Sequence, residues 1–188
     1  MTKLRSGIFA ATIAVCFLAT TAAVQADDKY YTRAFDATVA VDNGKAGVVT
    51  SRTISDGKGH QRIESKTAMG STVSIMDYNK KKMATIMEKN KMVVLSPLNP
   101  SAEPTETQKL NPKELGNQTI NGHPCKGQSY KIGPSTYEVW TGTDINYPVK
   151  STIVGPTGKT VTELKNFSNT PGAVSFDVPT TGYKVIGQ

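Results

Sequence analysis

The sequence predicts a mainly β protein built on one strongly curved antiparallel sheet of about ten or eleven strands. Short runs of strand-forming residues recur about every 8–12 residues, and turns rich in Gly, Asn, Asp or Pro separate them. Within several runs apolar and polar residues alternate, which is the period of a strand with one covered and one solvated face. Helical periodicity is almost absent, and we find no repeat and no second core signal, so we expect one domain.

Residues 1–26 have the pattern of a secretory signal peptide. Two basic residues precede an apolar run over residues 7–19, and Val24-Gln25-Ala26 is a small-residue cleavage pattern. The run is shorter than the roughly 20 apolar residues that a membrane-spanning helix needs. Cys16 lies inside the run, whereas a lipidated cysteine would stand at its end. We therefore expect export with cleavage after Ala26.

The expected mature chain, residues 27–188, is long enough to form one domain with its own core. Without the two basic residues of the signal, 20 of the 22 lysines and arginines remain against 15 acidic residues. These basic residues are spread among acids and form no dense patch, so we expect no nucleic-acid partner. The excess favours solubility, with weak attraction to anionic membranes as the second interpretation. Cys125 is the only cysteine left, so no internal disulfide can form.

Two predicted strands open the mature chain, and an antiparallel meander follows them. Residues 30–41 alternate apolar and polar side chains, and residues 46–54 return as the second strand. Asp42-Asn43-Gly44 joins them, because Asn and Gly tolerate the positive φ of a tight hairpin. Residues 60–95 contain four further strand-forming runs separated by short turns, which is the pattern of a meander.

Residues 96–116 interrupt this pattern. The interval contains four prolines, and each proline removes one donor from a sheet ladder. We predict a loop or lid over the sheet here, with at most a short helix near Lys113-Glu114-Leu115. Strands resume after it, in the runs 118–120, 125–132, 135–141, 148–154, 159–167 and 174–178.

A sheet of this size has to curl or close in order to bury its apolar face. Curling creates a concave interior, and an interior that the protein does not fill suits a lipid chain or another apolar ligand. The expected lining carries no ionisable group and consists of Phe35, Val39, Ile63, Val73, Ile75, Met83, Met87, Val94, Val139 and Ile153. Trp140 either joins this lining or packs into the core.

Four short stretches follow one another in a recognisable order over most of the expected mature chain. They are Arg62-Ile63 leading to Ile75-Met76-Asp77-Tyr78, the turn Asn121-Gly122-His123-Pro124-Cys125, Tyr137-Glu138-Val139-Trp140 with Tyr147-Pro148-Val149, and Phe176-Asp177-Val178-Pro179 with Gly182-Tyr183. This order resembles the LolA-like superfamily of periplasmic lipoprotein carriers and their lipid-binding relatives. The resemblance implies an unclosed antiparallel half-barrel with a helical cover over a hydrophobic cavity.

The resemblance also implies a periplasmic carrier that holds a lipid or the acyl chain of a lipoprotein and makes transient contact with membrane proteins or a membrane surface. We expect it to be a monomer. In the carriers an arginine of the meander holds the lid closed. Arg62 is the nearest match, although the family's neighbouring proline is absent here. The carriers begin with an amphipathic helix, whereas this chain enters its first strand a few residues after Asp27. A carrier for another lipid and a structural role in the envelope therefore stay open beside lipoprotein trafficking.

Two further interpretations belong to other classes of protein. Thioether, thiolate and imidazole groups suit Cu(I), although no close Met-x-x-Met spacing occurs and methionine is also the flexible filler of apolar cavities. An accessory protein that binds another protein through exposed sheet edges is the third interpretation. The residues available for copper are Met69, Met76, Met83, Met87, Met92, His123 and Cys125.

No pattern in the sequence points to catalysis. His123-Pro124-Cys125 places its two reactive groups on one turn, which does not give the geometry of a base and its nucleophile. Asp77 and Asp144 stand beside asparagines at strand ends, where we expect them to cap turns. The chain has no paired carboxylates, nucleophile elbow or glycine-rich phosphate loop. We expect a binding protein that is not an enzyme and needs no cofactor.

Overall fold

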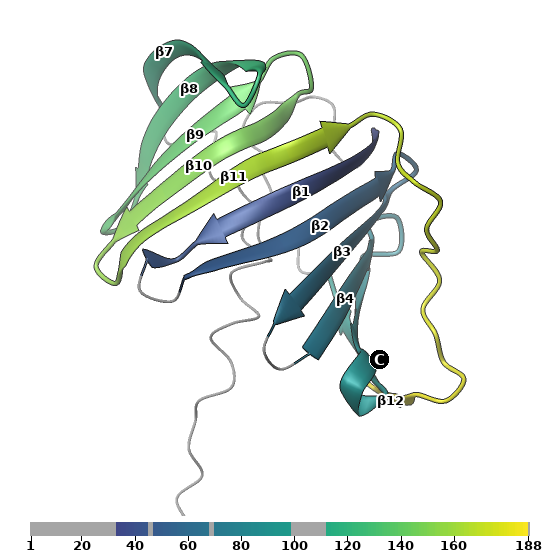
Figure 1. Ribbon diagram of the computed structural model, residues 1–188. Coiled ribbons are helices and arrows are strands. Elements are labelled where there is room, and N and C mark those ends of the chain that lie inside the picture. Colours follow the sequence, from purple (N-terminus) through teal and green to yellow (C-terminus); the bar gives the residue numbers. More distant parts are fainter. Residues whose placement is uncertain (1–32, 45–46, 68–69, 99–111, 188) are drawn as a thin grey trace, which may run out of the picture.

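The described residues form one curved sheet of twelve strands (Figure 1). The computed structural model describes residues 33–44, 47–67, 70–98 and 112–187, so the predicted signal peptide and most of the predicted lid lie outside it. The strands are β1 (Ala34–Asp42), β2 (Val48–Asp56), β3 (His60–Thr67), β4 (Gly70–Asp77), β5 (Lys82–Met87), β6 (Met92–Pro97), β7 (Lys113–Ile120), β8 (His123–Ile132), β9 (Ser135–Gly142), β10 (Tyr147–Gly155), β11 (Gly158–Ser168) and β12 (Lys184–Ile186).

The sheet is made of two meanders joined at β1. The strand order is β12-β6-β5-β4-β3-β2-β1-β11-β10-β9-β8-β7, so the pairing of β1 with β11 joins the meander β1–β6 to the meander β7–β11. All neighbours pair antiparallel except β12, which runs parallel to β6. The outer strands β7 and β12 do not pair with each other, so the sheet stays open. The predicted mainly β, unclosed and curved sheet is therefore confirmed.

Two local predictions were wrong. Lys113-Glu114-Leu115 belongs to β7 rather than to a short helix, because β8 offers it a pairing partner and a register shift between Glu114 and Gly116 absorbs the irregularity. Residues 174–178 do not form a strand, because they cross over one face of the sheet instead of lying along an edge where a ladder could form. The chain forms its last ladder later, as β12 against β6.

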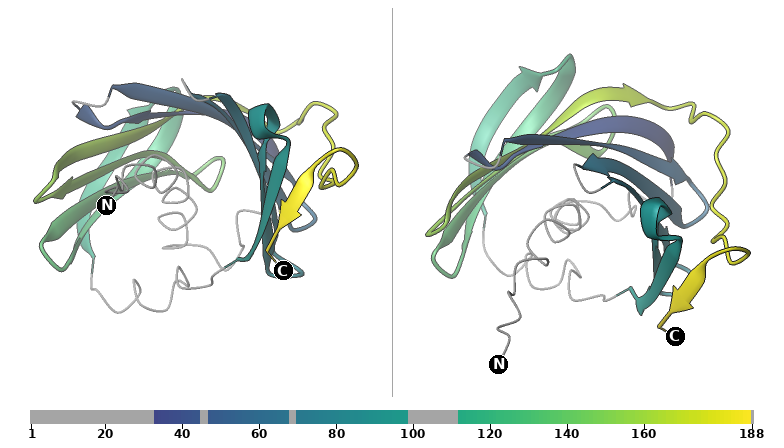
Figure 2. Two further views of the ribbon diagram at one scale, coloured as in Figure 1. Left: turned by 90° about the horizontal axis from the view of Figure 1, so that it is seen from below. Right: turned by 60° about the horizontal axis from the view of Figure 1, so that its bottom comes forward.

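The pairing from β1 to β6 assigns each side chain to a face, because its registers contain no shift. Figure 2 shows a single curved layer with the C-terminal segment, residues 169–183, on the convex side. That segment rests Phe176, Val178 and Tyr183 on a cluster formed by Val73, Ile75, Ala84, Ile86 and Val93. The odd-numbered side chains of β4 therefore face the convex side, and the even-numbered ones face the concave side.

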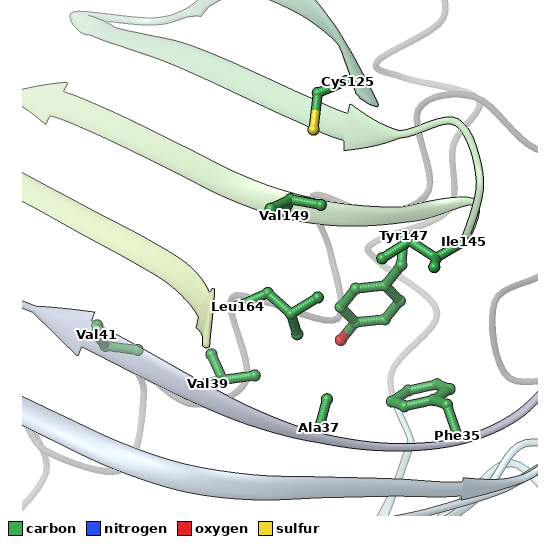
Figure 3. Packing of buried hydrophobic residues seen from close by; sticks show 9 residues of the cluster. All are labelled: Phe35, Ala37, Val39, Val41, Cys125, Ile145, Tyr147, Val149 and Leu164. Atoms are coloured by element: carbon green, nitrogen blue, oxygen red, sulfur yellow. The ribbon is translucent and has the colours of Figure 1, made fainter. Parts of the chain in front are cut away.

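The larger core cluster lies where β1, β10 and β11 meet (Figure 3). Phe35 packs on Tyr147 with 5.0 Å between ring centroids, and it stacks on Phe167 at 5.7 Å. Aromatic pairs at these separations add to the free energy gained by burial itself. The other buried members are Ala37, Val39, Val41, Cys125, Ile145, Val149 and Leu164.

None of the described segments is a helix of the length and hydrophobicity needed to cross a bilayer.

Candidate ligand-binding face

The concave face of β2 to β6 carries two bands of side chains. Strands β2 and β3 contribute a band that is mostly polar yet buried, and β4 to β6 contribute a band of methionines. Because side chains alternate along a strand, each band follows directly from the spacing of its residues by two. The first band contains Ser51, Thr53, Ser55, Gln61, Ile63 and Ser65, and the second contains Met76, Met83, Met87, Met92 and Val94.

The methionines of this face form two pairs across adjacent strands. Met76 of β4 lies opposite Met83 of β5, and Met87 of β5 lies opposite Met92 of β6. Residues directly opposite in an antiparallel ladder have Cβ atoms about 5 Å apart, so the two thioethers of each pair are neighbours. Met76 is buried, and the other three are half-buried. Unbranched, polarisable side chains of this kind adapt to ligands of variable shape.

One buried amide fixes the boundary between the two bands. Gln61 is only 2% exposed, and its Oε1 accepts a hydrogen bond of 2.9 Å from the hydroxyl of Tyr78. The same hydroxyl lies 3.7 Å from the sulfur of Met76. A buried amide without a partner would be costly, so this bond lets a polar side chain sit beside the methionines.

The lining predicted from the sequence divides between the two faces. Pairing places a large part of it on the concave face, whereas Val73 and Ile75 lie opposite Glu64 and Arg62 on the convex face. Trp140 packs, partly buried, against the main core cluster, and its ring covers Gly127, where an added Cβ would lie 2.5 Å from it. The concave members are Phe35, Val39, Ile63, Met83, Met87, Val94, Val139 and Ile153.

The alternation of β4 was visible in the sequence, but the face was not. Val73 and Ile75 alternate with Thr72 and Ser74, and either set could have pointed inward. The choice depends on the C-terminal segment, which supplies an apolar cover about 100 residues further along the chain. The sequence pattern did not predict the polar band of β2 and β3 on the concave face, since serines and threonines usually lie on the solvated face of a sheet.

Arg62 contacts the C-terminal segment from the convex face. Its Nη1 donates a hydrogen bond of 3.0 Å to the carbonyl of Ser175, and its Nε lies 2.7 Å from Oε1 of Glu64. The predicted latch residue thus holds a covering segment, but on the face opposite the methionines. Of the predicted lid, residues 99–111 lie outside the described residues.

Met69 lies outside the described residues, and the other candidate copper ligands lie on different parts of the sheet. Six strands separate β8, which carries His123 and Cys125, from β4. His123 Nδ1 lies 2.8 Å from Oδ2 of Asp144, and the thiol of Cys125 donates to the backbone carbonyl of His123 at 3.3 Å. Burial raises the pKa of the Cys125 thiol, which favours the less reactive protonated form. Among the described residues, no three His, Cys, Asp or Glu side chains gather in a metal-binding group.

Residues 40–178 match the family model described as "Domain of unknown function (DUF4412)". The chain belongs to this family. A search of curated proteins finds no match to the DUF4412 chain. Its fold is similar to that of an uncharacterized conserved protein from Thermus thermophilus, with 12% identity, a TM-score of 0.65, and coverage of 92% of this chain and 98% of that one.

Two further solved structures resemble this chain at low sequence identity. MucB in complex with MucA(peri), a pair also solved from Pseudomonas aeruginosa, is 12% identical with a TM-score of 0.59, over 89% of this chain and 61% of that one. A LolA superfamily protein from Nitrosomonas europaea is 10% identical with a TM-score of 0.34, over 82% and 92% of the two chains. At such identities the DUF4412 chain shares only a general fold with the Thermus thermophilus protein and MucB, and the site has to be argued from its own residues.

Proposed function

We propose that this DUF4412 protein is an exported, periplasmic binding protein that holds the acyl chain of a lipid or lipoprotein on the concave face of β2 to β6. The observation that carries the proposal is the position of the methionine pairs. The C-terminal segment covers β4 to β6 on the convex face, whereas Met83, Met87, Met92 and Val94 are half-buried on the other face. Within the described part of the chain, no second layer lies on that concave face (Figure 2).

The chemistry of this face suits a long apolar ligand better than a compact polar one. Each methylene buried contributes about 0.8 kcal/mol before the cost of ordering the ligand. The hydroxyls and the amide of the neighbouring band offer hydrogen bonds to an ester or carboxyl group at the end of the chain. The protein would act as a monomer that carries or senses its ligand without catalysis, and it needs no cofactor for this role.

The chain-length dependence of binding tests the proposal. Fluorescent fatty acids of increasing length should bind more tightly, by at most about fourfold per methylene. The double variant Met83→Gln, Met87→Gln should weaken binding at least tenfold, whereas Val154→Gln at an exposed position should leave it unchanged. Affinity that ignores chain length, or an equal loss in the two variants, would contradict the proposal.

Binding of a protein segment is the second candidate function. The outer strand β7 pairs only with β8 among the described residues, so its other edge is open to an added strand. The structure of MucB was solved with a partner, MucA(peri), which gives this candidate a precedent in a similar fold. Native mass spectrometry of the purified protein separates the classes, because a lipid, a peptide and copper add different masses.

A further inference from the structure

Two neighbouring turns at one end of the sheet are fastened to each other. The first joins β2 to β3, and the second joins β4 to β5. The backbone N–H of Tyr78 donates to the carbonyl of Gly59 at 2.9 Å, and Nδ2 of Asn79 donates to the carbonyl of Lys58 at 2.8 Å. A Cβ at position 59 would lie 2.6 Å from the amide of Asn79, and Gly59 has a φ of +94°. Only glycine permits this close approach, so the two turns form one surface.

This surface carries four exposed lysines, Lys58, Lys80, Lys81 and Lys82, which we call the lysine end. Lys80 pairs with Asp77 at 3.1 Å, and the other three form no ion pair among the described residues. The second acid nearby, Asp56, is already engaged by the backbone N–H of Lys58 and by the ring of His60. The lysine end therefore presents an excess of positive charge to solvent.

We propose that the lysine end docks the protein on an anionic lipid surface. Lysines are flexible point charges that suit a diffuse layer of headgroups, whereas binding to a defined acidic protein favours arginine and aromatic anchors, and the four charges here are all lysine. The ladder pair Asp77–Lys82 stands next to the pair Met76–Met83. A chain that leaves the bilayer at the lysine end would thus meet the Met76–Met83 pair of the concave face first, and the Met87–Met92 pair lies at the other end of β5.

This inference rests on the proposed function, because docking would bring the concave face to its lipid ligand. Docking on vesicles and binding of an acyl chain are nevertheless measured in separate experiments. The protein is produced from the full-length sequence and purified in the form that the cell makes. Its binding is measured by co-sedimentation with vesicles of phosphatidylcholine alone and of phosphatidylcholine mixed with phosphatidylglycerol, at low and high salt. Each lysine near an anionic surface contributes about fivefold in affinity, so the triple variant Lys58→Gln, Lys81→Asn, Lys82→Gln should bind mixed vesicles about a hundredfold more weakly.

A matched triple variant removes the same charge from the opposite end of the sheet. Lys66, Lys131 and Lys159 are exposed there, and changing all three to Gln should weaken vesicle binding less than tenfold. Equal losses in the two triple variants would overturn the inference, because net charge alone would then explain binding. Failure of the unaltered protein to bind mixed vesicles would also overturn the inference, even if the lysine end bound an acidic protein instead. Vesicle binding with this pattern but without acyl binding would uphold docking and reject the proposed function.

Discussion

At the scale of single residues, a ladder of charges crosses the convex face of β1, β2 and β3. Nε of Arg52 donates to Oδ1 of Asp36 at 3.0 Å, and Nη1 of Arg52 lies 3.7 Å from Oε2 of Glu64, which also pairs with Arg62. The hydrogen bond from Arg52 holds the pKa of Asp36 below its ordinary range, although partial burial opposes this shift. A backbone hydrogen bond from Gly172 lowers the pKa of Asp36 further, so the ladder also contacts the C-terminal segment.

The lowered pKa of Asp36 predicts a loss of stability in acid. A carboxyl group whose pKa is lower in the folded state stabilises the fold above its unfolded pKa of about 4, and this contribution is lost as the pH falls through the folded pKa. Asp36→Asn should cost up to about 1 kcal/mol of unfolding free energy at neutral pH and less in acid. Urea unfolding from pH 7 to pH 3 measures both. Glu138→Gln, at a site with no ion pair among the described residues, is the control, and equal pH profiles for Asp36→Asn and the unaltered protein would refute the assignment.

At the scale of elements, the C-terminal segment protects both a face and an edge of the sheet. Its apolar side chains cover the convex cluster, and β12 then pairs with β6, which would otherwise be an open edge strand. Between these two contacts, the hydroxyl of Tyr183 donates to Glu88 at 2.6 Å, and Nζ of Lys91 lies 5.0 Å from the Tyr183 ring. The hydrogen bond to Tyr183 and the pairing with Lys91 hold the pKa of Glu88 below its ordinary value.

Two valines of this segment test whether its apolar contacts hold it in place. Val178 is half-buried against the convex cluster, whereas Val185 of β12 is 41% exposed. Val178→Ala should lower the unfolding free energy by about 1 kcal/mol, and Val185→Ala should change it by less than about 0.5 kcal/mol. Denaturant unfolding followed by circular dichroism measures the difference. If the two variants lose equal stability, backbone pairing rather than apolar packing holds the segment.

At the scale of the whole molecule, the two halves of the sheet bury apolar surface on different faces. Around β1, β10 and β11 the main core lies with the side chains that face the concave interior, such as Phe35 and Val39. Across β4 to β6 the second cluster lies on the convex face instead. Apart from the buried Met76, the concave side chains of β4 to β6 therefore belong to neither cluster, and these are the side chains that the proposed function assigns to a ligand.

This division predicts where a bound acyl chain should change backbone protection. Amide exchange should slow most in β5 and β6 when a fatty acid is bound, because these strands carry the half-buried methionines. The amides of β9 and β10, whose concave side chains include the buried Val139 and Ser151, should change little and serve as an internal reference. Uniform slowing over the whole sheet would instead indicate general stabilisation, and unchanged exchange with lipid bound would place the ligand elsewhere.

The sequence by itself determined the strands and many of the turns, because these depend on neighbouring residues. Asn121 and Gly122 both adopt positive φ in the β7–β8 turn, as their side chains permit. Asp77 caps its turn as predicted, through a hydrogen bond of 2.8 Å from the backbone N–H of Lys80. Alternation along each strand likewise follows from local geometry, and it was enough to predict a curved sheet with one covered face.

The tertiary structure alone decided which side chains share the concave face. Val73 and Ile75 were predicted to line it, but they lie beneath Phe176 and Val178 on the other side. Period-two alternation is symmetric, so it cannot say which set points inward until a distant segment covers one of them. The pairing of β1 with β11, which joins the two meanders, and the parallel pairing of β12 with β6 likewise involve residues far apart in the sequence. Contacts at that separation depend on how the chain closes on itself, and no local pattern encodes them.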